Sequence, residues 1–380
     1  MDQPIPHKPL GCQRIALIFQ GGGALGAYQA GVYEALHEAG IEPDWITGVS
    51  IGAINAALIA GNTREQRLDR LRMFWERITD RRPPPFAPDT DALRRASNAA
   101  SAWLTITLGQ PGFFAPNTLS PWLSPAGTRT ATSYYDTAPL KATLEELVDF
   151  DLINQKHCRF AVGAVAVRTG NFFYFDNFGQ KIGPEHIMAS GALPPALPMV
   201  QVGGEQYWDG GLVSNTPLQH LLEHDDGKNA LVFQVDLFSA RGPLPTDMEA
   251  VLSRQKDIQY SSRTRYNTDV YRGLMAWKVR ARDLLAKVPE DRLTAEDKRL
   301  KAELAALPAI NILHLIYHER PYEGQAKDYE FSAASMREHW ASGYDDTKHT
   351  LAHPDWLAIP PGRVGVTVHD VHQLRERAGH

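Results

Sequence analysis

The chain has 380 residues, of which 43% are hydrophobic, 22% are charged and 9% are aromatic. These fractions are typical of a soluble globular protein, and they exclude both a disordered chain and one that lies mainly within a membrane. Because the formal net charge is −5, no overall positive field attracts nucleic acid, and we expect no nucleic-acid partner.

Neither the cysteines nor the N-terminus indicates a secreted or metal-binding protein. Cys12 and Cys158 are too few for a disulfide framework, and no Cys-x-x-Cys pair suggests a zinc or redox site. The N-terminus lacks the basic start and the apolar run of a secretory signal, and no apolar run approaches the ~18 residues of a membrane-spanning helix. We therefore expect a cytoplasmic protein that needs neither a metal ion nor a cofactor.

The first sixty residues alternate between strand and helix patterns. Residues 15–19 form a short apolar run that is typical of a strand buried on both faces, and a glycine turn follows. Apolar residues at helical spacing cover 24–39, and a second strand over 45–49 leads into an apolar helix over 51–60. This order predicts an α/β fold with a mainly parallel central sheet and crossover helices.

Residues 81–136 do not follow this pattern. The segment begins near three consecutive prolines, and its large apolar side chains show no clear period. We expect an irregular insertion that packs on the core. The alternative is an apolar lid or channel wall over the functional site, because long loops are often functional. The apolar side chains are Trp103, Leu104, Ile106, Leu108, Phe113, Phe114, Leu119, Trp122 and Leu123.

The rest of the chain adds two predicted hairpins and a helical extension. The hairpins cover 159–175 and 199–208, and the second leads into Asp209-Gly210-Gly211. Past Gly242 the sequence becomes charged and amphipathic, which predicts helices at 248–285, 294–307 and 332–351. The predicted organisation is a domain over 13–240 with the insertion at 81–136, a mostly helical extension over 241–351 with one added strand at 310–317, and tails at 1–12 and 352–380.

Ser50 lies in the sequence Gly48-Val49-Ser50-Ile51-Gly52, between the second predicted strand and its helix. This pattern is typical of the strand-to-helix elbow that exposes a nucleophilic serine. The pattern is short enough to occur by chance, and a serine in this place also suits the N-cap of a helix. Its value as a prediction therefore depends on partners elsewhere in the chain.

The glycine turn at Gly21, Gly22 and Gly23 admits two interpretations. With Gly26 it satisfies the Gly-x-Gly-x-x-Gly pattern of dinucleotide sites. Such a site also needs an acid at the end of the second strand, whereas Asp44 precedes that strand and a serine stands at its end. Free N–H groups at a helix N-terminus bind a phosphate and an oxyanion by the same physics, so the serine elbow favours acyl chemistry.

A catalytic histidine is the alternative partner for Ser50. An α/β-hydrolase would place serine, acid and histidine in that order along the chain, and His314 and His318 at the end of a late strand are its best candidates. His220 and His224, on or just after a predicted helix, are expected at the surface. The α/β-hydrolase fold has several strands before its elbow and this chain has one, which counts against a histidine triad.

Three motifs in this order resemble those of the patatin-like phospholipase family: the glycine turn, the serine elbow about thirty residues later, and Asp209-Gly210-Gly211. The resemblance covers residues 13 to about 240. It implies a three-layer α/β/α fold and a catalytic dyad of Ser50 and Asp209 without a histidine. It also implies that Gly21, Gly22 and Gly23 form the oxyanion hole.

Two other positions bear on this resemblance. The run Ala189-Ser190-Gly191-Ala192-Leu193-Pro194 matches a block of the family that is usually ascribed to support of the fold. Leu25 departs from the family pattern, because many members have Arg or Lys there. The missing cation puts in doubt a preference for anionic phospholipid headgroups, but it leaves the backbone donors of Gly22 and Gly23 in place.

The resemblance implies a serine acyl hydrolase for carboxylic esters of lipid-like substrates, of the phospholipase A, lysophospholipase or esterase type. Its partner would be a lipid or acyl-ester substrate, while transient contact with a membrane surface and assembly into a homo-oligomer stay open. One alternative is an acyltransferase to an alcohol or thiol, although such enzymes typically have a histidine where Val49 stands. Another is a non-enzymatic partner-binding protein assembled through the charged helices between Met248 and Leu307.

Overall fold

The computed structural model describes residues 7–79, 90–224, 226–262, 264–305, 307–360 and 364–370. Within these ranges, a nine-stranded sheet has the order β11-β10-β9-β1-β2-β5-β8-β7, and β6 pairs with β5. Pairs from β11 to β5 are parallel, whereas β6, β7 and β8 form antiparallel pairs. The prediction of a mainly parallel sheet is confirmed. The strands are β1 (Arg14–Phe19), β2 (Trp45–Gly48), β5 (Arg159–Ala166), β6 (Phe172–Asp176), β7 (Val200–Val202), β8 (Glu205–Asp209), β9 (Ala230–Asp236), β10 (Ala309–Ile316) and β11 (Gly365–Asp370).

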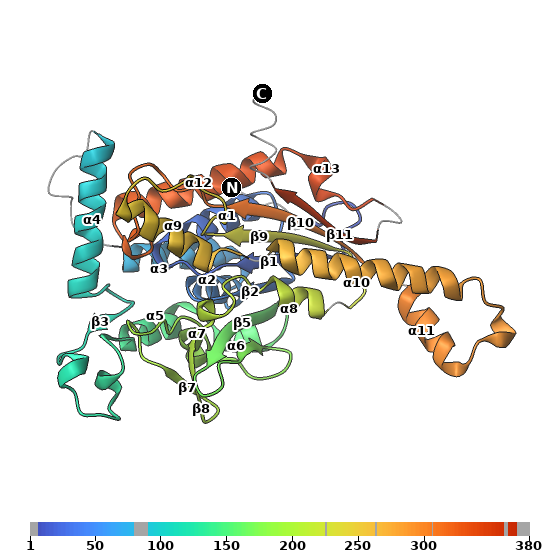
Figure 1. Ribbon diagram of the computed structural model, residues 1–380, viewed down its shortest axis with the longest axis horizontal. Coiled ribbons are helices and arrows are strands. Elements are labelled where there is room, and N and C mark those ends of the chain that lie inside the picture. The colour runs from blue at the N-terminus through green and yellow to red at the C-terminus, as the bar shows by residue number, and fades with distance from the viewer. Residues whose placement is uncertain are drawn as a thin grey trace.

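Strand β1 shows why helices cover both faces of the sheet. Its side chains alternate, so that Ile15 and Leu17 belong to one hydrophobic core and Ala16 and Ile18 to another. Helices α1 (Ala27–Glu38), α2 (Ile51–Ala60), α3 (Arg64–Ile78) and α12 (Ala333–Leu351) pack on the first core. Helices α8 (Leu218–Glu223) and α10 (Thr264–Leu285) pack on the second (Figure 1). The chain therefore has the predicted three-layer α/β/α fold, because a parallel sheet is buried on both faces.

Helices α5 (Ala138–Leu147), α6 (Phe150–Asn154) and α7 (Pro184–Ser190) also contribute buried side chains to the first core. None of the helices in the described ranges is both long enough and apolar enough to cross a lipid bilayer. Further α-helices are α9 (Met248–Tyr260), α11 (Ala295–Ala305) and α13 (Pro354–Leu357). The 3-10 helices are η1 (Gly23–Gly26), η2 (Pro121–Leu123), η3 (Arg129–Ala131), η4 (Gly210–Leu212), η5 (Glu290–Arg292) and η6 (Lys327–Tyr329).

The segment 81–136 is more regular than its sequence predicts, although residues 81–89 lie outside the described part. Helix α4 (Asp91–Leu108) fills much of it, and strands β3 (Ala115–Pro116) and β4 (Tyr135–Asp136) form a small sheet. The Thr90 hydroxyl caps α4 by accepting the Leu93 N–H at 3.3 Å. Ala102 and Thr105 are the buried residues of α4, whereas Leu93, Trp103, Ile106 and Leu108 are exposed, so much of the apolar side of this helix does not face the core.

The C-terminal half continues the same sheet. The helix expected at 248–285 is divided into α9 and α10, and Figure 1 shows α10 and α11 reaching beyond the sheet at the right of the view. Strand β10, which corresponds to the strand predicted at 310–317, pairs with β9 in parallel. The segment 352–380, expected as a tail, contributes α13 and strand β11, which pairs with β10. The division into domains at residue 240 stays a prediction.

Candidate active site

The ends of β2 and β8 meet on one edge of β5. Gly48, the last residue of β2, is opposite Val162, and Asp209, the last residue of β8, is opposite Ala164. Strand β6 pairs along the other edge of β5, so β2 and β8 share the remaining edge. The ends of β2 and β8 therefore approach each other. Ser50, two residues beyond Gly48, is thereby delivered next to Asp209.

Ser50 adopts the backbone geometry of a sharp elbow. Its φ is 56° and its ψ is −124°, a region that residues with a side chain rarely occupy. A Cβ at Gly48 would lie 2.3 Å from the Gly52 carbonyl, and a Cβ at Gly52 would lie 2.5 Å from the Phe19 carbonyl oxygen. Both glycines of the motif are therefore required by close backbone packing. Ser50 is the N-cap residue of α2, but its side chain caps none of the described N–H groups.

The Ser50 side chain contacts Asp209 instead. Its hydroxyl is hydrogen-bonded to the Asp209 carboxylate, which also accepts the Gly211 N–H at 2.7 Å. Asp209 is only 2% exposed. Burial raises the pKa of Asp209 to about 6, and the two hydrogen bonds limit this rise because they favour the ionised form. A carboxylate with this pKa accepts protons at neutral pH more readily than an ordinary aspartate does.

The segment from Ala189 to Pro194 accepts hydrogen bonds from the backbone of both Ser50 and Asp209. The Ser50 N–H donates to the Ser190 hydroxyl and carbonyl oxygens at 3.1 and 3.2 Å. The Ser190 hydroxyl in turn donates to the Gly163 carbonyl at 2.6 Å, between the ends of β2 and β8. Two residues further on, the Ala192 carbonyl accepts the Asp209 N–H at 3.0 Å. One short segment thus fixes the backbone of both Ser50 and Asp209.

The three glycines of the turn differ in the use of their N–H groups. The Gly21 N–H donates to the Asn215 carbonyl at 3.3 Å, and the Asn215 side chain donates back to the Gly21 carbonyl at 3.0 Å. In the part of the chain that the structure describes, the N–H groups of Gly22 and Gly23 make no backbone hydrogen bond. Of the three predicted oxyanion donors, these two are available to a ligand.

Neither Leu25 nor Asp44 offers a charged side chain to the glycine turn. Leu25 is fully buried in the hydrophobic core. Asp44 accepts the Ile15 N–H at 2.8 Å and pairs with Lys8, at the start of the first strand rather than at its carboxyl end. A dinucleotide site at the glycine turn would therefore lack its acidic partner.

Ser50, Asp209 and the glycine turn line a cavity of about 90 Å³. Most of the other side chains around it are apolar or aromatic. The insertion supplies Phe113, Phe114 and Tyr135, so it forms a wall of the site. The other lining side chains include Leu193, Ala196, Leu197, Asn215, Phe238, Tyr260, Asp328, Tyr329 and Phe331.

Segments beyond residue 240 complete this cavity. The sequence does not predict this contribution. A Cβ at Gly23 would lie 2.2 Å from the Asp328 carbonyl oxygen, so η6 packs directly on the glycine turn. Lys256 pairs with Asp328 at 2.6 Å, and Lys327 pairs with Asp257 at 2.7 Å. These two reciprocal ion pairs, the ion-pair clamp, join α9 to η6. Burial raises the pKa of Asp328, and Lys256 opposes that rise.

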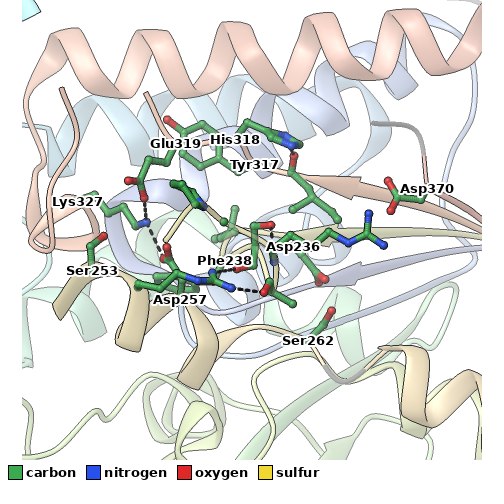
Figure 2. A pocket seen from close by; sticks show the side chains of 18 of the residues that line it. Asp236, Phe238, Ser253, Asp257, Ser262, Tyr317, His318, Glu319, Lys327 and Asp370 are labelled. Atoms are coloured by element: carbon green, nitrogen blue, oxygen red, sulfur yellow. Dashed lines mark hydrogen bonds and ion pairs between the residues drawn. The ribbon is translucent and has the colours of Figure 1, made fainter. Parts of the chain in front are cut away.

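A larger cavity of about 1000 Å³ lies outside the carboxyl ends of β9, β10 and β11 (Figure 2). His314 and His318 line it, and neither lines the cavity of Ser50. The His314 ring lies 2.6 Å from Asp236. Figure 2 also shows the Lys327 ammonium group between the carboxylates of Asp257 and Glu319. The two histidines are thus placed apart from the serine that a triad would require.

His220 is buried, so its predicted place at the surface is wrong. It is 3% exposed, its Nε2 lies 2.9 Å from the Asp176 carboxylate, and its ring stacks on Tyr174. The helical period placed it correctly on α8, but this face of α8 covers the sheet. His224 is exposed as expected. Within the described residues, no group of three or more His, Cys, Asp or Glu side chains could hold a metal ion.

Two family models match the chain in sequence. The model for patatin-like phospholipases matches residues 17–222, which hold the glycine turn, Ser50 and Asp209. The chain belongs to the patatin-like phospholipase family. A second model, described as patatin phospholipase, matches residues 258–363. Family membership thus extends to the segments that complete the cavity from the C-terminal side.

Individual relatives match over shorter stretches. A lysophospholipase, nte1 of Aspergillus terreus, is 56% identical over 46 residues, which is 12% of this chain and 3% of that protein. A triacylglycerol lipase, ptl3 of Schizosaccharomyces pombe, is 44% identical over 59 residues, which is 16% of this chain and 12% of that protein. The chain therefore spans a small part of the length of these relatives. In structure, it is similar to VipD of Legionella pneumophila, with a TM-score of 0.40 and 14% identity over 93% of this chain and 71% of that one.

Proposed function

We propose that the protein is a serine acyl hydrolase that cleaves carboxylic esters of lipid-like substrates, with Ser50 as nucleophile and Asp209 as base. One observation carries this proposal: the Ser50 hydroxyl is hydrogen-bonded to a buried carboxylate in a cavity whose other walls are largely aromatic. Family membership and the names of the two enzymes similar to short segments of the chain, a lysophospholipase and a triacylglycerol lipase, support an ester of a lipid as substrate.

The reaction proceeds through an acyl-enzyme. Asp209 accepts the Ser50 proton while Ser50 Oγ attacks the ester carbonyl, and the alcohol leaves with a proton returned from the Asp209 carboxyl group. Water then attacks the acyl-enzyme with Asp209 again as base, which releases the fatty acid and restores the Ser50 hydroxyl. Each half-reaction leaves Asp209 ionised, so the cycle needs no other proton carrier.

Backbone donors stabilise the negative charge that develops on the carbonyl oxygen. Gly22 and Gly23 line the cavity at the start of η1, and among the described residues their N–H groups make no backbone hydrogen bond. Removal of one oxyanion donor costs on the order of 10²–10³ in rate in serine hydrolases. Because these donors belong to the backbone, the apolar Leu25 does not weaken them. The N-terminus of α2, directly after Ser50, adds a positive dipole at the same place.

A fluorophosphonate probe tests this proposal, because it forms a covalent bond with an activated serine. The wild-type protein should be labelled and should release fatty acid from a lipid ester, whereas Ser50→Ala should lose both properties. Ser120→Ala, at an exposed serine of the insertion, is the matched control and should behave as wild type. The proposal is rejected by equal labelling of the Ser50→Ala variant. Product analysis with an added alcohol acceptor separates hydrolysis from acyl transfer.

A further inference from the structure

The insertion contains a long segment that is almost free of charge. Arg129 is the sole charged residue between Arg95 and Asp136, although 22% of the whole chain is charged. A surface segment of this length normally carries several charged side chains, because these residues are rarely buried. The missing charges therefore indicate that this surface meets something other than bulk water.

Large apolar side chains are exposed in the same segment. Trp122 is 85% exposed, Leu123 78% and Trp103 63%. Together with Leu108, Leu119 and Ile106, which are 58%, 54% and 48% exposed, they form what we call the insertion patch. Single exposed apolar residues are common on soluble proteins, but several on one short segment mark an interaction site.

Hydrogen bonds join the two halves of the insertion patch. The Trp122 indole N–H donates to the Tyr134 hydroxyl at 3.3 Å, and the hydroxyl of the next residue, Tyr135, donates to the Ile106 carbonyl. The pairing of β3 with β4 closes the loop that carries Trp122. In Figure 1, α4 and the loop after β3 both lie at the left edge of the molecule. The patch is thus carried by one connected unit.

The same unit forms a wall of the Ser50 cavity. Phe113 and Phe114 line the cavity and stand in the sequence between Leu108 and Leu119 of the insertion patch. Tyr135 also lines the cavity and follows the patch residues within the same insertion. The rings of Phe114 and Tyr135 meet edge to face at 4.8 Å. The inner side of the insertion is therefore apolar toward the substrate, and its outer side is apolar toward solvent.

We propose that the insertion patch docks the protein on an uncharged lipid–water interface, such as a phosphatidylcholine membrane. This inference rests on the proposed function, since a lipid hydrolase must reach a substrate that is aggregated. Tryptophan favours such an interface, where its ring lies among headgroups and its N–H keeps a polar partner. An anionic surface fits poorly, because the patch offers little positive charge and the whole chain carries −5.

Sedimentation with phosphatidylcholine vesicles tests the docking surface. The full-length protein should bind, and the double variant Trp103→Ser/Trp122→Ser should bind at least about tenfold more weakly, because each indole buries 150–250 Å². Trp277→Ser is the matched control, since Trp277 is 68% exposed on α10 outside the insertion, and it should bind as wild type. Binding should not weaken when salt is raised, because no ion pairs contribute to it.

Hydrolysis separates docking from chemistry. Neither tryptophan of the double variant lines the Ser50 cavity, so this variant should hydrolyse a soluble short-chain ester as wild type does and should lose at least about tenfold of its rate on vesicles. Ser50→Ala should still bind vesicles, so a failure of the proposed chemistry leaves the docking result intact. Equal vesicle binding by the double variant, or an equal loss in Trp277→Ser, overturns the inference. The inference is also overturned if light scattering without lipid gives the double variant half the molecular mass of the wild-type protein. That result would show that the patch binds a second copy of the chain.

Discussion

The Ser50 hydroxyl is hydrogen-bonded to Asp209, a carboxylate that burial holds at a pKa of about 6. The proposed reaction needs this carboxylate ionised, so kcat/KM for a soluble ester should rise with pH through an apparent pKa near 6 and level off above about 7. Initial rates between pH 4 and pH 8 provide the measurement. A profile that is flat between pH 5 and pH 8 would show that Asp209 is not the base.

The same burial predicts that Asp209→Asn stabilises the protein while it removes activity. The pKa of Asp209 is raised from 3.8 to about 6 on folding, so the ionised form is destabilised in the folded state. The penalty is absent below pH 3.8, grows between pH 3.8 and pH 6, and reaches about 3 kcal/mol above that range. Asparagine avoids this penalty and still offers an oxygen to the Gly211 N–H.

Denaturant unfolding at two pH values measures this effect. At pH 8 the Asp209→Asn variant should have a higher free energy of unfolding than wild type, and at pH 4 the difference should nearly vanish. Lower stability of the variant at pH 8 would contradict the sign of the shift. Asp209→Ala serves as the control for shape, because it removes the charge but also leaves a cavity.

The two glycines after Asp209 should tolerate alanine to different degrees. A Cβ at Gly210 would lie 2.6 Å from the Gly163 carbonyl oxygen, which is fixed backbone. A Cβ at Gly211 would meet the side chains of Asn215 at 2.9 Å and Asp209 at 3.1 Å, which have more freedom to move. We expect Gly210→Ala to lower kcat by about 10² or more, since it displaces the base, and Gly211→Ala to lower it less. Esterase rates of the two folded variants, checked by circular dichroism, decide; equal losses would contradict the prediction.

The N-terminal half could be predicted because its signals are local. Ile15 to Phe19 are apolar without interruption, and the glycine turn follows directly. Apolar residues at helical spacing come next, so adjacent residues predict the strand, the turn and the helix. The approach of Ser50 to Asp209 has no such local signal. It depends on two strands meeting at Gly163, and motif resemblance rather than residue spacing indicated it.

The parts that the sequence did not predict lack an apolar period or depend on distant partners. Helix α4 leaves several of its large apolar side chains exposed, so its place outside the core does not follow from its apolar residues, although Thr90 and Gly109 mark its ends. Strand β11 lies at the edge of the sheet, and none of its residues is fully buried. Lys256 and Asp328 are charged residues far apart in the chain, and nothing near either residue indicates that the two pair over the glycine turn.

The ion-pair clamp predicts that Lys256→Met weakens both stability and activity. The variant leaves the Asp328 carboxylate, whose side chain is 12% exposed, without Lys256 as its partner. The free energy of unfolding should fall by about 2 kcal/mol. Because η6 packs on Gly23, a loosened η6 should also lower kcat by at least about tenfold. Melting temperature and esterase rate provide the two measurements.

The control for the clamp is an exposed ion pair. Lys301 pairs with Glu290, and 35% and 70% of these side chains are exposed, so Lys301→Met should change the free energy of unfolding by less than about 0.5 kcal/mol and leave the rate unchanged. If Lys256→Met is as mild as this control, the clamp does not hold the glycine turn.

His314→Gln distinguishes a Ser–Asp dyad from a mechanism that needs a histidine. His314 lines the larger cavity with Asp236, so the His314→Gln variant should keep an esterase rate within about twofold of wild type. Its free energy of unfolding should be lower than that of wild type by about 3 kcal/mol near pH 6.

Burial lowers the pKa of His314, but the attraction of Asp236 outweighs this effect and the folded pKa is raised. The stabilisation is therefore complete below the ordinary histidine pKa and is lost as pH rises through the folded value. Denaturant unfolding at pH 6 and pH 9 should show a smaller difference between variant and wild type at pH 9. Loss of esterase activity in a variant that remains folded would contradict the Ser–Asp dyad and indicate that the reaction needs His314.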